Sequence, residues 1–146
     1  MKTLIFKTLI SASKQKVWDT MIEPETYAAW TGEVWPASYY VGEWKTGENL
    51  SFIGASGSGT LATLLDCNPY DHILAKHIAV LLPGGAEDRE SEMACGWINS
   101  LEEYTFGEKD GATELTVSMT VGPDWETMFN HDWPKAMAKL KAVCEA

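Results

Sequence analysis

The sequence carries little positive charge. Only one of its 146 residues is an arginine, Arg89, and 11 basic residues stand against 21 acidic ones, so the formal net charge is −10. A surface of this charge repels phosphate groups, and a clamp of several arginines around a phosphate cannot be assembled. The composition therefore argues against binding to nucleic acids and against adhesion to anionic membranes.

Cysteines and long apolar runs are also scarce. Cys67, Cys95 and Cys144 have no disulfide or metal-binding spacing, and we expect them to be reduced and mostly buried, as in a cytoplasmic protein. The first ten residues, MKTLIFKTLI, superficially resemble a signal peptide, but Lys7 interrupts the apolar run and no clean cleavage site follows. No segment reaches the roughly 20 apolar residues that span a bilayer. We predict a cytoplasmic protein without a membrane span.

Motifs for metals, phosphates and dinucleotides are absent as well. His72, His77 and His131 are scattered, and none lies at ligand spacing from a cysteine. There is no P-loop and no dinucleotide fingerprint. Cys95 has neither a neighbouring base nor a positive environment in its segment, so a buried cysteine is a better interpretation than a nucleophile. We predict neither a metal site nor a cofactor.

The regular pattern begins at the N-terminus of what we predict to be one domain over residues 1–146. β-forming residues over 3–10 predict a strand. Ser13 is a suitable N-cap for a short helix that presents an apolar face. Pro24 is suited to the first turn of a second short helix, which we expect to end near Gly32.

Residues 32–121 are expected to form about six strands separated by turns. The clearest hairpin joins LEEYTFGEK to ATELTVSMTV across Asp110-Gly111, a pair that favours tight turns. Apolar and polar residues alternate strictly along the second arm. This alternation indicates an antiparallel sheet that is covered on one face only.

The C-terminal segment returns to helical spacing. Trp133, Met137, Leu140 and Cys144 follow one another at intervals of three or four residues and form an apolar stripe. Pro134 removes a backbone donor, so we expect this helix to begin near residue 133, with Asp132 as its N-cap, rather than to continue a preceding turn. The stripe would cover the apolar face of the sheet.

The order of strand, two short helices, sheet and terminal helix resembles the START-like (SRPBCC) superfamily, and within it the Activator of Hsp90 ATPase homologue 1-like branch. The segments that carry the resemblance are SASKQKVWDTMIEPETYAAW (11–30), VGEWKTGENLSF (41–52), GTLATLLDCNPYDHI (59–73), GATELTVSMT (111–120) and the terminal DWPKAMAKLKAVCEA. The resemblance implies an α+β helix-grip fold, in which a curved antiparallel sheet of six to seven strands packs on the C-terminal helix. It also implies a cavity between sheet and helix that commonly takes a hydrophobic ligand. The superfamily has no universal catalytic residues to carry over.

Aromatic side chains are abundant, with seven tryptophans, five tyrosines and four phenylalanines. Rigid rings with polar N–H and O–H groups are difficult to pack without gaps, so they form either a core corner or the wall of a cavity. Trp35 lies beside Pro36 in a loop, where we expect it to be exposed or to gate an opening, and we expect Trp30 near the entrance. Whether Tyr39 or Tyr40 faces inward stays open. Our candidate ligand-binding residues are Trp30, Trp44, Phe52, His77, Trp97, Tyr104, Met119, Phe129 and Trp133.

Two polar positions are candidates for chemistry. His77 shares strand parity with Ile73 and Ala79, so it faces inward, either as a satisfied core group or as a group that transfers a proton. It is a weak catalytic candidate. Glu102 and Glu103 are adjacent on one strand, so one of them faces the covered side unless a bulge or the sheet edge exposes it, which is the simpler explanation.

Three functions from different classes remain open. The first is binding of a small hydrophobic or aromatic molecule, the second is a polyketide cyclase/dehydratase-like enzyme, and the third is an interaction module that regulates a chaperone. A homodimer is possible. The nine acidic residues between Glu87 and Glu114 could dock a basic partner, although a solvated face is the simpler interpretation.

Overall fold

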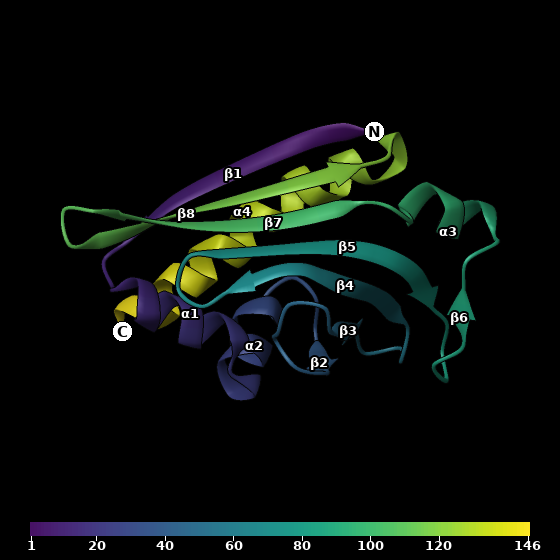
Figure 1. The fold of residues 1–146 in the computed structure, drawn as a ribbon, viewed down its shortest axis with the longest axis horizontal. Helices are drawn as coiled ribbons and strands as arrows, with labels where there is room; N and C mark the ends of the chain where they lie inside the picture. The colour runs from purple at the N-terminus through teal and green to yellow at the C-terminus, as the bar shows by residue number, and fades with distance from the viewer.

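The computed structural model describes residues 1–146 (Figure 1). Its elements are β1 (Lys2–Ile10), α1 (Lys14–Ile22), α2 (Pro24–Thr31), β2 (Tyr39–Val41), β3 (Asn49–Ile53), β4 (Gly59–Asn68), β5 (His72–Leu81), β6 (Glu87–Asp88), α3 (Glu92–Trp97), β7 (Leu101–Lys109), β8 (Ala112–Val121) and α4 (Pro123–Glu145).

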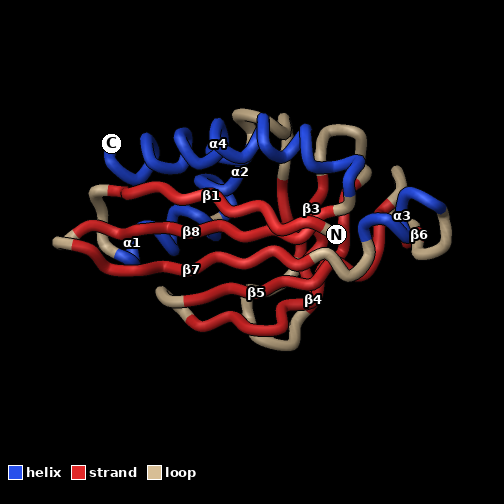
Figure 2. The backbone as a smooth tube through the Cα atoms, turned by 90° about the horizontal axis from the view of Figure 1, so that it is seen from above, coloured by secondary structure: helices blue, strands red, loops and turns tan.

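The strands form one antiparallel sheet in the order β1-β8-β7-β5-β4-β3-β2, with the two-residue β6 paired to β5 outside this path. The first strand pairs with the last: β1 lies antiparallel to β8 along its whole length, from Lys2 opposite Val121 to Ile10 opposite Thr113. The sheet curves around α4, which runs beside β1 (Figure 2). The predicted α+β helix-grip architecture is therefore confirmed. No helix of the structure is both long and apolar enough to cross a bilayer.

Local sequence signals explain the first helices and the last hairpin. Ser13 caps α1 by accepting a hydrogen bond from the backbone N–H of Lys16 at 3.1 Å. Pro24 occupies the first turn of α2, and Gly32 ends that helix. Asp110 and Gly111 have φ angles of 52° and 81°, the left-handed values that a tight hairpin turn requires at both central positions. All three predictions are confirmed.

The prediction that the helix is interrupted at Pro134 is wrong. One helix runs from Pro123 to Glu145 with Pro134 inside it, and its N-cap is Gly122 rather than Asp132. Pro134 and Asn130, whose carbonyl loses its usual partner four residues later, are both exposed, so water can solvate that carbonyl. The buried face of the helix therefore continues without interruption through the proline.

A short helix, α3, interrupts the region expected to contain only strands. Ser91 caps it by accepting a hydrogen bond from the Ala94 N–H at 3.1 Å, and Ala94 and Trp97 form its buried side. Cys95 points away from that side and is exposed, contrary to the expectation that it is buried. Cys67 and Cys144 are buried, and all three thiols are free.

The sheet buries one face and leaves the other without a covering helix. Along β5 the residues Ile73, Ala75, His77 and Ala79 are buried, whereas the alternate positions are partly exposed. The same alternation runs along β8. The inner face packs against α1, α2 and α4, and the predicted one-sided sheet is confirmed.

Candidate ligand-binding cavity

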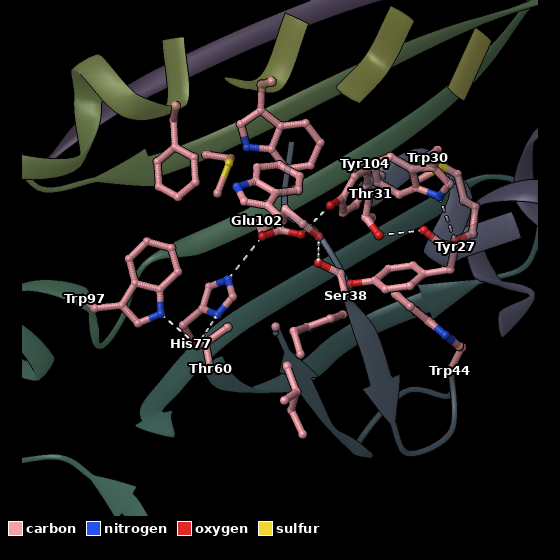
Figure 3. Close-up of a pocket in the computed structure, with 18 residues that line it drawn as sticks. Tyr27, Trp30, Thr31, Ser38, Trp44, Thr60, His77, Trp97, Glu102 and Tyr104 are labelled. Carbon is pink, nitrogen blue, oxygen red and sulfur yellow. Dashed lines mark hydrogen bonds and ion pairs between the residues drawn. The ribbon is translucent and has the colours of Figure 1, made fainter. Parts of the chain in front are cut away.

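A cavity of about 260 Å³ lies between the inner face of the sheet and the helices α2 and α4 (Figure 3). The structure brings all nine of the predicted ligand-binding residues to its wall. That they bind a ligand stays a prediction. The remaining lining residues were not named as ligand-binding candidates from the sequence; they are Met21, Tyr27, Thr31, Trp35, Ser38, Ile53, Gly54, Thr60 and Glu102.

Aromatic rings from distant parts of the chain make up most of the wall. Trp133 of α4 lies 6.3 Å from Trp30 and 5.4 Å from Trp35, measured between ring centroids. At the other end, Trp97 stacks on Phe129 with centroids 5.8 Å apart. Such edge-on and offset contacts are the arrangements that aromatic pairs prefer. The rings thus pack against one another and still leave a space between them.

Of the two neighbouring tyrosines, Tyr40 faces inward and Tyr39 faces solvent. The Tyr40 hydroxyl donates a hydrogen bond to the Ile22 carbonyl, whereas Tyr39 is 49% exposed. Trp30, expected near the entrance, is instead an interior wall residue that is 3% exposed. Trp35 is half-buried against Trp133.

A continuous chain of polar side chains lies along one side of the cavity. The Trp97 indole donates to the Thr60 hydroxyl at 2.7 Å, and that hydroxyl lies 2.9 Å from His77 Nδ1. On the other side of the imidazole, Nε2 lies 3.2 Å from Glu102 Oε1. Glu102 Oε2 accepts a hydrogen bond from the Tyr104 hydroxyl. Figure 3 shows this chain running from Trp97 through His77 to Glu102 and Tyr104.

The two ends of the chain fix the direction of donation. An indole can only donate, and burial, with the charge of Glu102 second, raises the pKa of Tyr104 well above its usual value, so its hydroxyl keeps its proton and donates. The single Thr60 proton has two acceptors, His77 Nδ1 and the Ala79 carbonyl at 3.2 Å. The first choice leaves a neutral His77 that donates from Nε2 to a carboxylate. His77 Nδ1 lies closer to the Thr60 hydroxyl than the Ala79 carbonyl does, which favours the first arrangement, with the imidazole proton on Nε2 facing Glu102.

Glu102 faces the cavity, and the sequence-based explanation of an exposed or bulged position is wrong. Strand β7 is regular here, with Glu102 opposite Ala75 on one side and Met119 on the other. The Glu102 side chain is only 14% exposed. It shares parity with Tyr104, and this parity is the sequence signal that could have identified it.

Glu103 faces the outer side of the sheet and pairs with His72. His72 Nε2 lies 2.7 Å from Glu103, and Nδ1 lies 2.5 Å from Asp66. Burial lowers the pKa of His72, but the hydrogen bonds and charges of Asp66 and Glu103 outweigh it, so the pKa is raised above its usual value. This cluster is separate from the cavity.

The cavity contains no lysine or arginine, and its only carboxylate is Glu102. Two of its indole N–H groups, those of Trp44 and Trp133, have no hydrogen-bond partner in the protein. No group of three or more His, Cys, Asp or Glu side chains is arranged to hold a metal ion. The chemistry available is therefore that of an aromatic pocket with one imidazole–carboxylate pair.

Comparison with solved structures identifies the architecture. The Aha1 dimer from Colwellia psychrerythraea aligns with a TM-score of 0.75 and 14% identity, covering 99% of this chain and 97% of that one. The chain has a START-like fold. CalU16 from Micromonospora echinospora aligns with a TM-score of 0.67 and 16% identity, covering 97% of this chain and 75% of CalU16.

DynU16, a protein in the dynemicin biosynthetic locus, shares the START-like fold, with a TM-score of 0.74 and 16% identity. The alignment covers all of this chain but 48% of DynU16, so the chain spans about half of its length. No profile of a protein family matches the sequence, and no curated protein matches it. At these identities the structural similarities establish the fold alone.

Proposed function

We propose that the protein binds a small hydrophobic or aromatic molecule in the cavity between the sheet and α4. The observation that carries the proposal is a space of about 260 Å³ in which 12 of the 18 lining residues are hydrophobic. The space is partly open to solvent. Concave, mostly apolar spaces with a few polar groups are the usual form of small-molecule sites.

The size of the cavity limits the ligand. An apolar cavity of about 150 Å³ is large enough to hold one benzene ring. The volume of about 260 Å³ is therefore suited to a molecule of about two fused rings with a short substituent. The polar chain on one side would orient that substituent, as a few convergent polar groups do in ligand sites generally.

Native mass spectrometry of protein purified from its own cells tests this proposal. We expect a second species whose additional mass disappears when the protein is denatured. A panel of one-ring and two-ring hydrophobic compounds should also change the tryptophan fluorescence, because tryptophans line the site. Absence of any co-purified compound, together with no fluorescence response to the panel, would contradict ligand binding.

An enzyme that cyclises or dehydrates its ligand is the second candidate, and one observation favours it. His77 is 1% exposed and lies 3.2 Å from the Glu102 carboxylate inside the cavity, where the pair could accept and return a proton. If a bound compound is turned over, His77→Ala should abolish turnover and leave binding measurable. His131→Ala is the matched control, because His131 is exposed on the outside of α4. Unchanged turnover in His77→Ala would remove His77 as the acid or base.

A homodimer and a chaperone-regulating role stay as further predictions. The Aha1 protein from Colwellia psychrerythraea, which shares the fold, was solved as a dimer. This is the reason to measure the molar mass of the present protein by light scattering during size-exclusion chromatography. A mass of twice 16.1 kDa would support the homodimer, and a mass of one chain at high concentration would exclude it.

The chaperone role rests on the resemblance to the Activator of Hsp90 ATPase homologue 1-like branch, and co-sedimentation with a purified Hsp90 chaperone would test it.

A further inference from the structure

The charges that line the cavity are unbalanced. Among its 18 lining residues there is one carboxylate, Glu102, one imidazole, His77, and no lysine or arginine. The protein as a whole carries a net charge of −10. Both the local and the overall field therefore favour a positively charged ligand over a negatively charged one.

Glu102 has unused capacity to accept hydrogen bonds. Each of its carboxylate oxygens receives one hydrogen bond, from His77 on Oε1 and from Tyr104 on Oε2. A carboxylate has about four acceptor positions, so about two remain free. In Figure 3 the carboxylate lies in the middle of the side chains that line the cavity. A ligand with an N–H donor could reach it there.

The aromatic walls add a second attraction for cations. Faces of tryptophan, tyrosine and phenylalanine rings carry negative electrostatic potential, and they attract a cation most strongly where water is excluded. Rings from Tyr27, Trp30, Trp44 and Tyr104 are among those that line this space together with Glu102. An anion would meet the same ring faces and the carboxylate with no cationic side chain to pair with it.

We propose that the cavity selects a protonated aromatic amine, whose ammonium group donates to Glu102 and whose ring system lies against the aromatic walls. This inference rests on the proposed function, since it specifies the ligand class of the same site. A neutral alcohol of the same shape would keep the ring contacts and one hydrogen bond. A carboxylate of the same shape would be repelled by Glu102.

Three probes with one ring system test the inference by isothermal titration calorimetry at neutral pH: 2-naphthylmethylamine, 2-naphthylmethanol and 2-naphthoate. We expect the amine to bind about 10-fold or more tightly than the alcohol, because the neutral alcohol lacks both the ion pair with Glu102 and the attraction of the ring faces for a cation. The carboxylate should bind most weakly. Glu102→Gln should reduce the preference for the amine to less than about threefold.

Glu103→Gln is the matched control, because it removes the same charge from the neighbouring residue on the outer face. It should leave the ratio of amine to alcohol affinity unchanged. If the alcohol or the carboxylate binds wild-type protein as tightly as the amine, the inference is wrong and the proposed function stands. If none of the three probes binds, the inference is wrong as well, and the co-purification and fluorescence experiments decide the proposed function. The order of the three probe affinities for wild-type protein tests the inference even if Glu102→Gln does not fold.

Discussion

Replacement of Tyr104 by phenylalanine tests the polar chain in the cavity most simply. The substitution keeps the ring and removes only the hydroxyl that donates to Glu102 Oε2. Tyr104 is 5% exposed, so only water that enters the cavity could take the place of the lost donor. One carboxylate oxygen would then lose its only protein partner.

The expected cost follows from the charge on the acceptor. Removing one partner of a hydrogen bond to a charged group destabilises a protein by about 1.5–3 kcal/mol. For a domain of this size, each 1 kcal/mol lowers the melting temperature by about 2–4 °C. We therefore expect Tyr104→Phe to melt about 3–12 °C below the wild-type protein.

Tyr27→Phe is the matched control. Tyr27 also lines the cavity and is 8% exposed, but its hydroxyl makes no hydrogen bond within the protein. Its stability should change by less than about 0.5 kcal/mol. Thermal unfolding followed by circular dichroism measures both variants. If Tyr104→Phe loses no more stability than Tyr27→Phe, the hydrogen bond to Glu102 does not contribute as we infer.

Three further predictions concern the rest of the fold. Pro134→Ala should stabilise the protein by about 1–3 kcal/mol, because it restores a donor for the Asn130 carbonyl inside α4; a lower melting temperature would contradict this. The pKa of His72 is raised in the folded protein by its carboxylate partners. Below the unfolded-state pKa of 6.5 these partners therefore stabilise the fold, and the stabilisation is lost as the pH rises through the folded-state pKa. The loss of stability in His72→Gln should therefore be larger at about pH 6 than at about pH 9, and an equal loss at both would refute the pairing. Cys95 is the exposed thiol, whereas burial raises the pKa of Cys67 to about 11. Brief maleimide treatment of native protein should therefore add one label, measured by intact mass. Rapid addition of two or three labels would contradict the burial pattern.

Much of the fold follows from short-range patterns. The Ser13 cap, the proline at the start of α2 and the Asp110-Gly111 turn each depend on residues within four positions of one another, and all appear as expected. The alternation along β8 likewise identified the buried face. Such features are local, so a single sequence contains the information that determines them.

The sequence-based predictions fail where contacts between residues distant in the sequence determine the structure. Pro134 weakens a helix locally, yet the apolar face that includes Phe129 and Met137 packs on the sheet on both sides of it, and that packing maintains a single helix. The helix α3 spans six residues, too few for a reliable helical period. Local strand parity could not show that Glu102 has a partner in His77, because the two residues come from different strands.

The same distinction applies to the cavity wall. Ring positions on inward faces could be predicted from strand and helix periodicity, and all nine predicted residues reach one cavity. Thr60 was missed because its role depends on Trp97, 37 positions away. Likewise, Tyr40 rather than Tyr39 faces inward because its hydroxyl meets the Ile22 carbonyl in α1.

The most direct test of binding in the cavity is a methyl NMR spectrum of methionine-labelled protein during titration with neutral 2-naphthylmethanol. Met21 and Met119 line the cavity, whereas Met93 and Met128 are 49% and 39% exposed on the surface. An aromatic ring in the cavity should shift the methyl signals of Met21 and Met119 by its ring current and leave those of Met93 and Met128 in place. A saturating titration that shifts only the exposed methionines, or none of the four, would contradict ligand binding between the sheet and α4.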